Sequence, residues 1–141
     1  MHLGLRTRLH KECHMRKGFE KLVVWQEAKG LAIAVFQVAR EAPLSKEWAL
    51  RDQMQRAAIS VSSNIAEGFE RESLKDELRF LSIAKGSVSE LRSQVIIAGE
   101  MGLLEHEEGR RLNDHCHRVG SLIFKLMRHK RDLIQCRPPS T

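Results

Sequence analysis

The stretch LRDQMQRAAISVSSNIAEGFERES, residues 50–73, carries the pattern that decides the fold. Its apolar side chains recur at steps of three and four positions: Leu50, Met54, Ala57, Val61 and Ile65. This spacing is typical of one side of an α-helix, so we predict a helix over about residues 46–67. Gly68 follows directly and is interpreted as the C-terminal cap, because a left-handed backbone costs glycine little.

The same period predicts three more helices, over about residues 19–40, 73–101 and 105–133. Ser73 resembles the first residue of a capping box, with Asp76 in the position usually taken by Glu or Gln. On the helix that follows, a second apolar seam is formed by Phe80, Ile83, Ile97 and Met101. No alternating strand pattern of useful length is present. The sequence therefore predicts an all-α fold, an up-down-up-down four-helix bundle.

Length and composition fit a single soluble domain. The chain has 141 residues, of which 42% are hydrophobic and 30% charged. We predict a basic N-terminal tail at 1–18, the bundle domain at 19–133 and a C-terminal tail at 134–141. No apolar run is long enough to span a membrane or to form a secretory signal. The three cysteines include no Cys-x-x-Cys pair, which favours a reducing, cytoplasmic environment over a disulfide framework.

The net charge of +6 is concentrated at the two ends of the chain. Residues 1–18 hold five Lys or Arg against one acid, and residues 125–137 also hold five against one. Such ends are either solvated tails or electrostatic arms for phosphate backbones. On the second interpretation, the candidate nucleic-acid contacts are Lys17, Lys125, Arg128, Lys130 and Arg131.

A polar stripe interrupts the apolar pattern of the two central helices. The first helix presents Gln53, Arg56, Ser60, Asn64 and Glu67, and the second presents Ser87, Glu90 and Gln94. The stripe is a solvated face, a set of half-buried groups paired across helices, or a ligand site that uses Glu67 with Glu90. On the second interpretation, these groups fix helix register or cap the start of the next helix, because buried polar atoms need partners. The structural polar corner would then comprise Gln53, Arg56, Asn64, Glu67, Gly68, Ser87 and Glu90.

Catalytic and metal chemistry find little support. Glu-x-x-His motifs, which usually accompany paired-carboxylate metal sites in bundles, are absent. His115, Cys116 and His117 are consecutive, and consecutive helical residues point about 100° apart, so they cannot converge on one ion. His10 and His14 can do so only if the N-terminal tail is helical. We expect no catalytic residue, no metal and no cofactor.

Three blocks make the sequence similar to a known family: FEKLVVWQEA at 19–28, residues 50–73, and FLSIAKGSVSELRSQVIIAGEMGLL at 80–104. Over about residues 19–130 the chain resembles the four-helix bundle proteins encoded in intervening sequences of bacterial 23S ribosomal RNA genes. The resemblance implies a left-handed bundle that assembles as a homopentamer, with no catalytic residues to carry over. It extends distantly to the accessory variability protein of diversity-generating retroelements, a basic pentamer that associates with nucleic acid.

Three classes of function are compatible with these observations. The first is a non-enzymatic oligomer that associates with nucleic acid, with RNA as the first expectation. The second is a protein–protein scaffold or adaptor that binds no nucleic acid, and the third is an enzyme or metal protein. We favour the first. The expected partners are other copies of the chain, RNA, or another protein, and no membrane.

Overall fold

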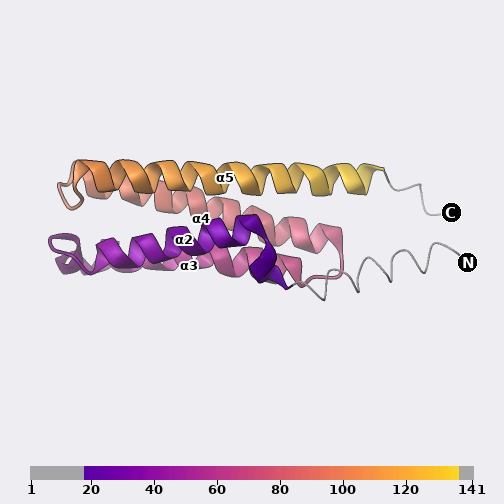
Figure 1. Cartoon of the computed structure of the whole chain (residues 1–141), viewed down its shortest axis with the longest axis horizontal. Helices are drawn as coiled ribbons and strands as arrows, with labels where there is room; N and C mark the ends of the chain where they lie inside the picture. The colour runs from indigo at the N-terminus through magenta and orange to yellow at the C-terminus, as the bar shows by residue number, and fades with distance from the viewer. Residues whose placement is uncertain (1–17, 137–141) are drawn as a thin grey trace, which may run out of the picture.

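The computed structural model describes residues 18–136, which form four α-helices and two short 3-10 helices (Figure 1). The α-helices are α2 (Val23–Ala39), α3 (Trp48–Phe69), α4 (Leu74–Glu100) and α5 (His106–Gln135). The 3-10 helices are η1 (Phe19–Lys21) and η2 (Leu44–Lys46). No strand occurs within residues 18–136, so the prediction of an all-α chain with four helices is confirmed.

Successive helices run in opposite directions, as the residues that meet between them show. Between α3 and α4, Ser60 meets Ser87, whereas Gly68, further along α3, lies against Phe80, earlier on α4. The contacts between α4 and α5 show the same reversal: Arg92 with Asn113, and Glu77 with Lys130. Helices α3 and α4, and likewise α4 and α5, are therefore antiparallel, and the ribbon shows the same reversal between α2 and α3 (Figure 1).

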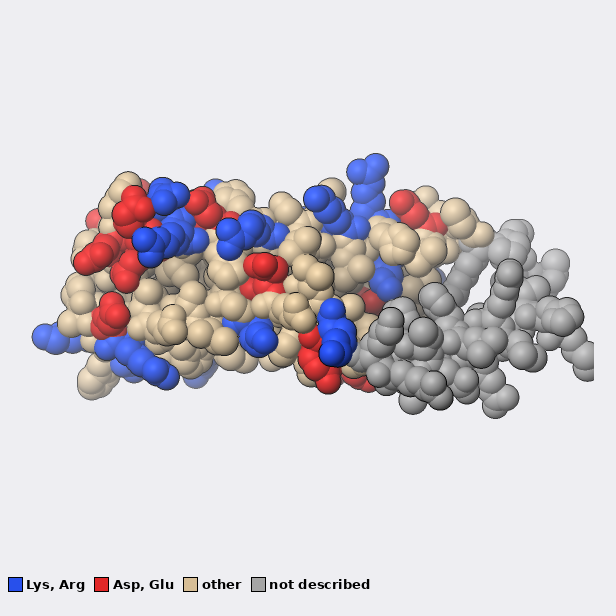
Figure 2. Space-filling view, viewed as in Figure 1, with Lys and Arg blue, Asp and Glu red and all other residues tan. Residues whose placement is uncertain are grey.

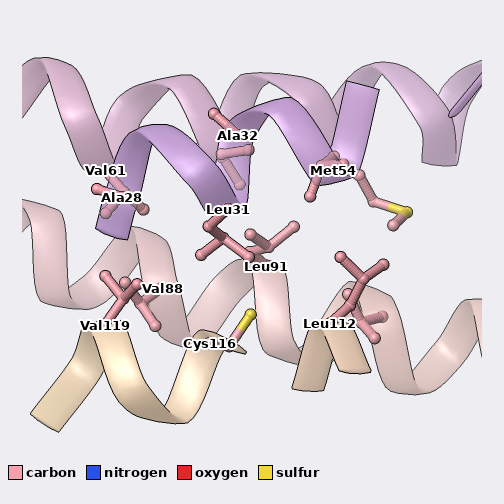
Figure 3. Close-up of a cluster of buried hydrophobic side chains, with 14 of the residues drawn as sticks. Ala28, Leu31, Ala32, Met54, Val61, Val88, Leu91, Leu112, Cys116 and Val119 are labelled. Carbon is pink, nitrogen blue, oxygen red and sulfur yellow. The ribbon is translucent and has the colours of Figure 1, made fainter. Parts of the chain in front are cut away.

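The hydrophobic core fills the space between the four helices, and each helix contributes to it (Figure 3). The largest side chains with under 2% exposure include Leu31, Met54, Ile65, Leu81, Leu91 and Ile123. Within each helix the buried positions recur every three or four residues, as the sequence pattern predicts. Removal of this apolar surface from water, at about 25 cal/mol per Å², is the main force that holds the bundle together.

The start of α4 is capped as predicted, and its end is closed by glycine. Ser73 is the N-cap, and its Oγ accepts a hydrogen bond from the Asp76 amide at 3.1 Å. After α4, Gly102 adopts a left-handed backbone with φ 73°. The Leu103 amide then bonds back to the Ala98 carbonyl at 2.9 Å. This Schellman arrangement satisfies a terminal carbonyl of α4 and turns the chain towards α5.

The interpretation of Gly68 as a helix cap is wrong. Helix α3 continues through Gly68 to Phe69, and Gly68 does not adopt a positive φ. A Cβ atom at this position would lie 3.1 Å from the Phe80 Cβ and 3.3 Å from the Glu77 carbonyl oxygen. Glycine is therefore suited to this position because it lets α3 and α4 approach closely, not because it ends α3.

Other boundaries differ from the prediction by a few residues. The first segment begins with η1 and an extended Leu22, so α2 starts at Val23 rather than at residue 19. Helix α5 runs to Gln135, beyond the predicted end of the bundle domain at 133. An apolar period marks which residues face the core, and helical hydrogen bonds can continue past the last of them.

The second apolar seam of α4 lies largely at the surface. Ile83 and Ile97 are each 46% exposed and Met101 is 58% exposed, whereas Phe80 is half-buried. Exposed apolar side chains that lie close together commonly mark surfaces that contact other molecules, and Ile97 and Met101 are one turn apart, whereas the exposed Glu90 lies between Ile83 and Ile97. None of the helices within residues 18–136 combines the length and the apolar character needed to cross a membrane.

Candidate nucleic-acid interface and polar stripe

One hydrogen-bonded connection in the polar stripe joins α3 to α4. The Oγ atoms of Ser60 and Ser87 lie 2.8 Å apart. Asn64 Nδ2 donates to the Ser60 carbonyl at 2.8 Å and to the Ser60 Oγ at 3.1 Å. Ser87 is buried and the other two residues are half-buried. Their small polar side chains allow the helices to approach while keeping their hydrogen bonds, so this group helps to set the register of α3 against α4.

The rest of the predicted polar corner is not gathered around this connection. Four of its members are exposed: Gln53, Arg56, Glu67 and Glu90. Glu67 pairs with Arg71, which lies just beyond the end of α3, and does not cap α4. Glu90 accepts a hydrogen bond from Gln94 Nε2 at 3.3 Å, within α4. These residues therefore form a surface stripe beside the Ser60–Ser87 connection, not one cluster.

Glu67 and Glu90 are too far apart to form a paired-carboxylate site. The antiparallel register that joins Ser60 to Ser87 places Glu67 opposite the beginning of α4, near Phe80. Glu90 is ten positions beyond Phe80 on that helix, which corresponds to about 15 Å along its axis. The interpretation of these two residues as one ligand site is therefore wrong.

The His and Cys residues near the middle of α5 do not converge. His115 is half-buried, and its Nε2 lies 3.1 Å from both the carbonyl oxygen and the carboxylate Oε2 of Glu27 on α2. His117 is exposed, and Cys116 is fully buried in the core. Within residues 18–136, no three or more His, Cys, Asp or Glu side chains come together in a group that could hold a metal ion. His10, Cys13 and His14 lie outside the described residues.

Cys116 is expected to alkylate at least about a hundredfold more slowly than Cys136 in the folded chain. Burial raises the pKa of the Cys116 thiol to about 11, which lowers its thiolate fraction near neutral pH by about two powers of ten. Cys136 is exposed. Peptide mass spectrometry after iodoacetamide treatment measures both rates, and unfolding in urea should bring them together. Equal rates in the folded chain would contradict the burial of Cys116.

The basic end of α5 holds the predicted nucleic-acid contacts, and they differ in their surroundings. Lys125, Arg128 and Arg131 are exposed, and no acid pairs with them within the described part of the chain. Steps of three residues rotate each of them about 60° from the last, so they wind around the outer surface of α5. Lys17 lies outside the described residues.

Lys130 differs from these cations because it is already paired. Its ammonium lies 3.0 Å from the Glu77 carboxylate, and the two side chains are only 14% and 13% exposed. Loss of either partner would leave the other charge partly buried without compensation. Lys130 therefore ties the end of α5 to the start of α4 and is poorly placed to meet a phosphate.

Sequence reasoning missed two arginines in the first half of α5. Arg111 and Arg118 precede Lys125 at steps of seven residues, or about two helical turns each. All three therefore share one side of α5. The seven-residue spacing could have shown that they share a side with Lys125. A count of net charge does not show it, because neighbouring acids cancel the charge of these arginines.

The comparisons with known proteins agree with the architecture. The family model of the 23S rRNA-intervening sequence protein matches residues 20–125. Among solved structures, the chain is similar to a protein of unknown function from the S23 ribosomal protein family of Bacteroides thetaiotaomicron. That match has a TM-score of 0.69 and 19% identity, and covers 74% of this chain and 98% of the other. No curated protein matches the chain. The structural likeness shows a shared fold.

Proposed function

The chain belongs to the 23S rRNA-intervening sequence protein family, and on that premise we propose that it is a non-enzymatic, cytoplasmic protein that associates with RNA. The observation that carries the proposal is the set of exposed cations at the end of α5, Lys125, Arg128 and Arg131, which no acid neutralises within residues 18–136. Figure 2 shows basic side chains along α5, mixed with acids near its beginning.

These cations suit a contact with the phosphate backbone rather than with bases. They are exposed on α5 at steps of three residues. Cations of this kind neutralise phosphates and release counterions, which gives affinity without sequence preference. The proposed RNA contact is therefore electrostatic, and its strength should depend steeply on salt.

The double variant Lys125→Gln/Arg128→Gln is expected to bind single-stranded RNA more weakly and with a shallower salt dependence. Each phosphate that a cation neutralises adds about 0.7 to the slope of log affinity against log salt, so the slope should fall by about 1.4. Fluorescence anisotropy with a labelled oligouridylate over a series of KCl concentrations measures both quantities. The matched control is Arg40→Gln/Lys46→Gln, which removes the same charges from an exposed turn elsewhere.

Two results would count against RNA association. One is tight binding by the wild-type chain that ignores salt, and the other is an identical loss in both double variants. If no RNA binds, a partner that stays with the chain after nuclease treatment would support the alternative function, a protein–protein scaffold.

We also propose that the chain assembles with its own copies, as a left-handed up-down-up-down bundle within a homopentamer. The exposed seam of Ile83, Ile97 and Met101 supports assembly, because a monomer would leave these side chains in water. Assembly would also repeat the α5 cations around a symmetry axis, so one RNA strand could contact several copies at once.

A further inference from the structure

A cleft of about 460 Å³ opens between α2 and the first half of α5. Its α5 side is mostly basic and includes Arg110, Arg111, His115 and Arg118, with Asp114 as its one acid. Its α2 side is formed by Ala34. The cleft borders the first half of α5, whereas the basic end of the helix, at Lys125, Arg128 and Arg131, lies in its second half. It is a separate site from the Lys125, Arg128 and Arg131 set.

The cleft exists because α2 presents small side chains at this level. Gly30 lies one turn before Ala34, and a Cβ at Gly30 would be only 3.4 Å from the His115 ring. His115 in turn contacts Glu27 at 3.1 Å, which fixes its ring against α2 at one edge of the cleft. With no large side chain from α2 to fill the space, the arginines of α5 border an opening.

The three arginines are not equivalent. Arg110 is paired twice, with Glu107 at 2.9 Å and with Asp114 at 3.3 Å, and the first of these bonds lowers the pKa of Glu107. Arg111 and Arg118 have no ion-pair partner within residues 18–136. Asp114, the one acid among the residues that line the cleft, is therefore already paired with Arg110. Two guanidinium groups that form no ion pair within this part of the chain therefore remain at the opening opposite Ala34, although Arg111 is near enough to Glu107 to add to the lowering of the pKa of that carboxyl.

The spacing of these two arginines suits a phosphate group. Residues seven positions apart lie on the same side of a helix, separated by about 10 Å along its axis. Two arginine side chains are long enough to reach one phosphate group between them, or two neighbouring phosphates of a nucleic-acid strand. The planar guanidinium fork donates two parallel hydrogen bonds to a phosphate, a geometry that lysine lacks.

We propose that the cleft between α2 and α5 binds a phosphate group through Arg111 and Arg118. The choice of an RNA backbone as the source of that phosphate rests on the proposed function; the binding of phosphate itself does not. Lys125, at the basic end of α5, follows Arg118 by another seven residues and therefore lies on the same side of the helix as the cleft. RNA bound along this side would contact a row of three cations.

The first test is calorimetric titration of the full chain with inorganic pyrophosphate at low salt. Wild-type chain should show saturable binding, and Arg111→Gln/Arg118→Gln should bind about tenfold or more weakly, because each lost contact is a charge-assisted hydrogen bond. The control Arg40→Gln/Arg79→Gln removes two exposed arginines outside the cleft and should bind like wild type. No saturable binding by wild type, or equal losses in both variants, overturns the proposal.

A second variant tests whether pyrophosphate binds inside the cleft or only through the positive charge of the surface. Ala34→Leu fills the cleft without changing net charge, and should weaken pyrophosphate binding while leaving helix content by circular dichroism unchanged. Ala34→Ser, which is close in size, should keep the wild-type affinity. If Ala34→Leu binds as tightly as wild type in a chain that remains folded, phosphate does not enter the cleft and the proposal fails.

Whether the bound phosphate belongs to an RNA backbone is tested by measuring the binding of oligouridylate to the same variants. Loss of RNA affinity in Arg111→Gln/Arg118→Gln, with a salt slope lower by about 1.4, identifies the RNA backbone as the ligand. Pyrophosphate binding without any RNA binding keeps the phosphate site and rejects the proposed function. RNA binding that the cleft variants leave unchanged, together with no pyrophosphate binding, keeps the proposed function and rejects the phosphate site.

Discussion

Replacing Leu91 with alanine is expected to lower the free energy of unfolding by about 2–5 kcal/mol, the usual range for a leucine truncated inside a packed core. Leu91 is fully buried on α4, at the centre of the cluster that includes Leu31 of α2 (Figure 3). Alanine removes three methylene-sized groups and leaves a cavity that the surrounding helices cannot collapse to fill. A loss of this size is a large part of the stability of a typical domain.

Urea unfolding followed by circular dichroism measures this loss, with all variants compared at one chain concentration because the proposed assembly would contribute to stability. The matched control is Leu133→Ala, which makes the same chemical change at a position that is 42% exposed. It should cost well under half as much. Similar costs at both positions would show that the side chain of Leu91 is not in a tightly packed core.

The same core explains why the fold could be predicted from the sequence. Burial on one side of a helix requires apolar residues at steps of three and four, and residues 50–65 follow that rule closely enough to reveal α3 by themselves. Ser73 was equally readable, because an N-cap depends on residues within one turn. Local rules thus gave the helices and one of their caps.

Gly68 shows where such local rules stop. Glycine near a helix end is compatible with a left-handed cap and with a close approach to another helix, and only the position of α4 distinguishes the two. In the structure the deciding atoms are the Phe80 Cβ and the Glu77 carbonyl, which belong to another helix. The same holds for Lys130, since its partner Glu77 is more than fifty positions away in the sequence.

The candidate site was harder to predict than the fold for the same reason. A count of charge identified the basic end of α5 but could not tell the paired Lys130 from the exposed Lys125. It also passed over Arg111 and Arg118, because neighbouring acids balance them in the sequence although those acids pair with Arg110 instead. Which cations remain free depends on contacts that only the folded chain displays.

The assembly of the chain depends, in our proposal, on one side of α4. Ile83, Ile97 and Met101 share that side, at steps of fourteen and four residues, and all three are substantially exposed. Ile96 is almost equally exposed, at 44%, but points about 100° away, towards the side of α4 that carries Lys85 and Arg92. Ile97 and Met101 lie one turn apart and form an exposed apolar pair, whereas Ile96 lies among cations, so the side of Ile97 is the better candidate for contact with a second copy.

Ile97→Lys is therefore expected to dissociate the assembly, whereas its neighbour Ile96→Lys should leave it intact. An ammonium buried without a partner in an interface costs several kcal/mol, enough to separate copies held by a modest apolar contact. In sedimentation analysis, the wild-type chain and Ile96→Lys should have a mass several times that of the 16.2 kDa chain, about fivefold for a pentamer. Ile97→Lys should have the mass of one chain, and its helix content by circular dichroism should be unchanged. A monomeric wild-type chain would refute assembly itself. The two substitutions differ only in the direction in which the lysine points from α4. An equal effect of both would therefore show that the interface is not on the Ile83–Ile97–Met101 side.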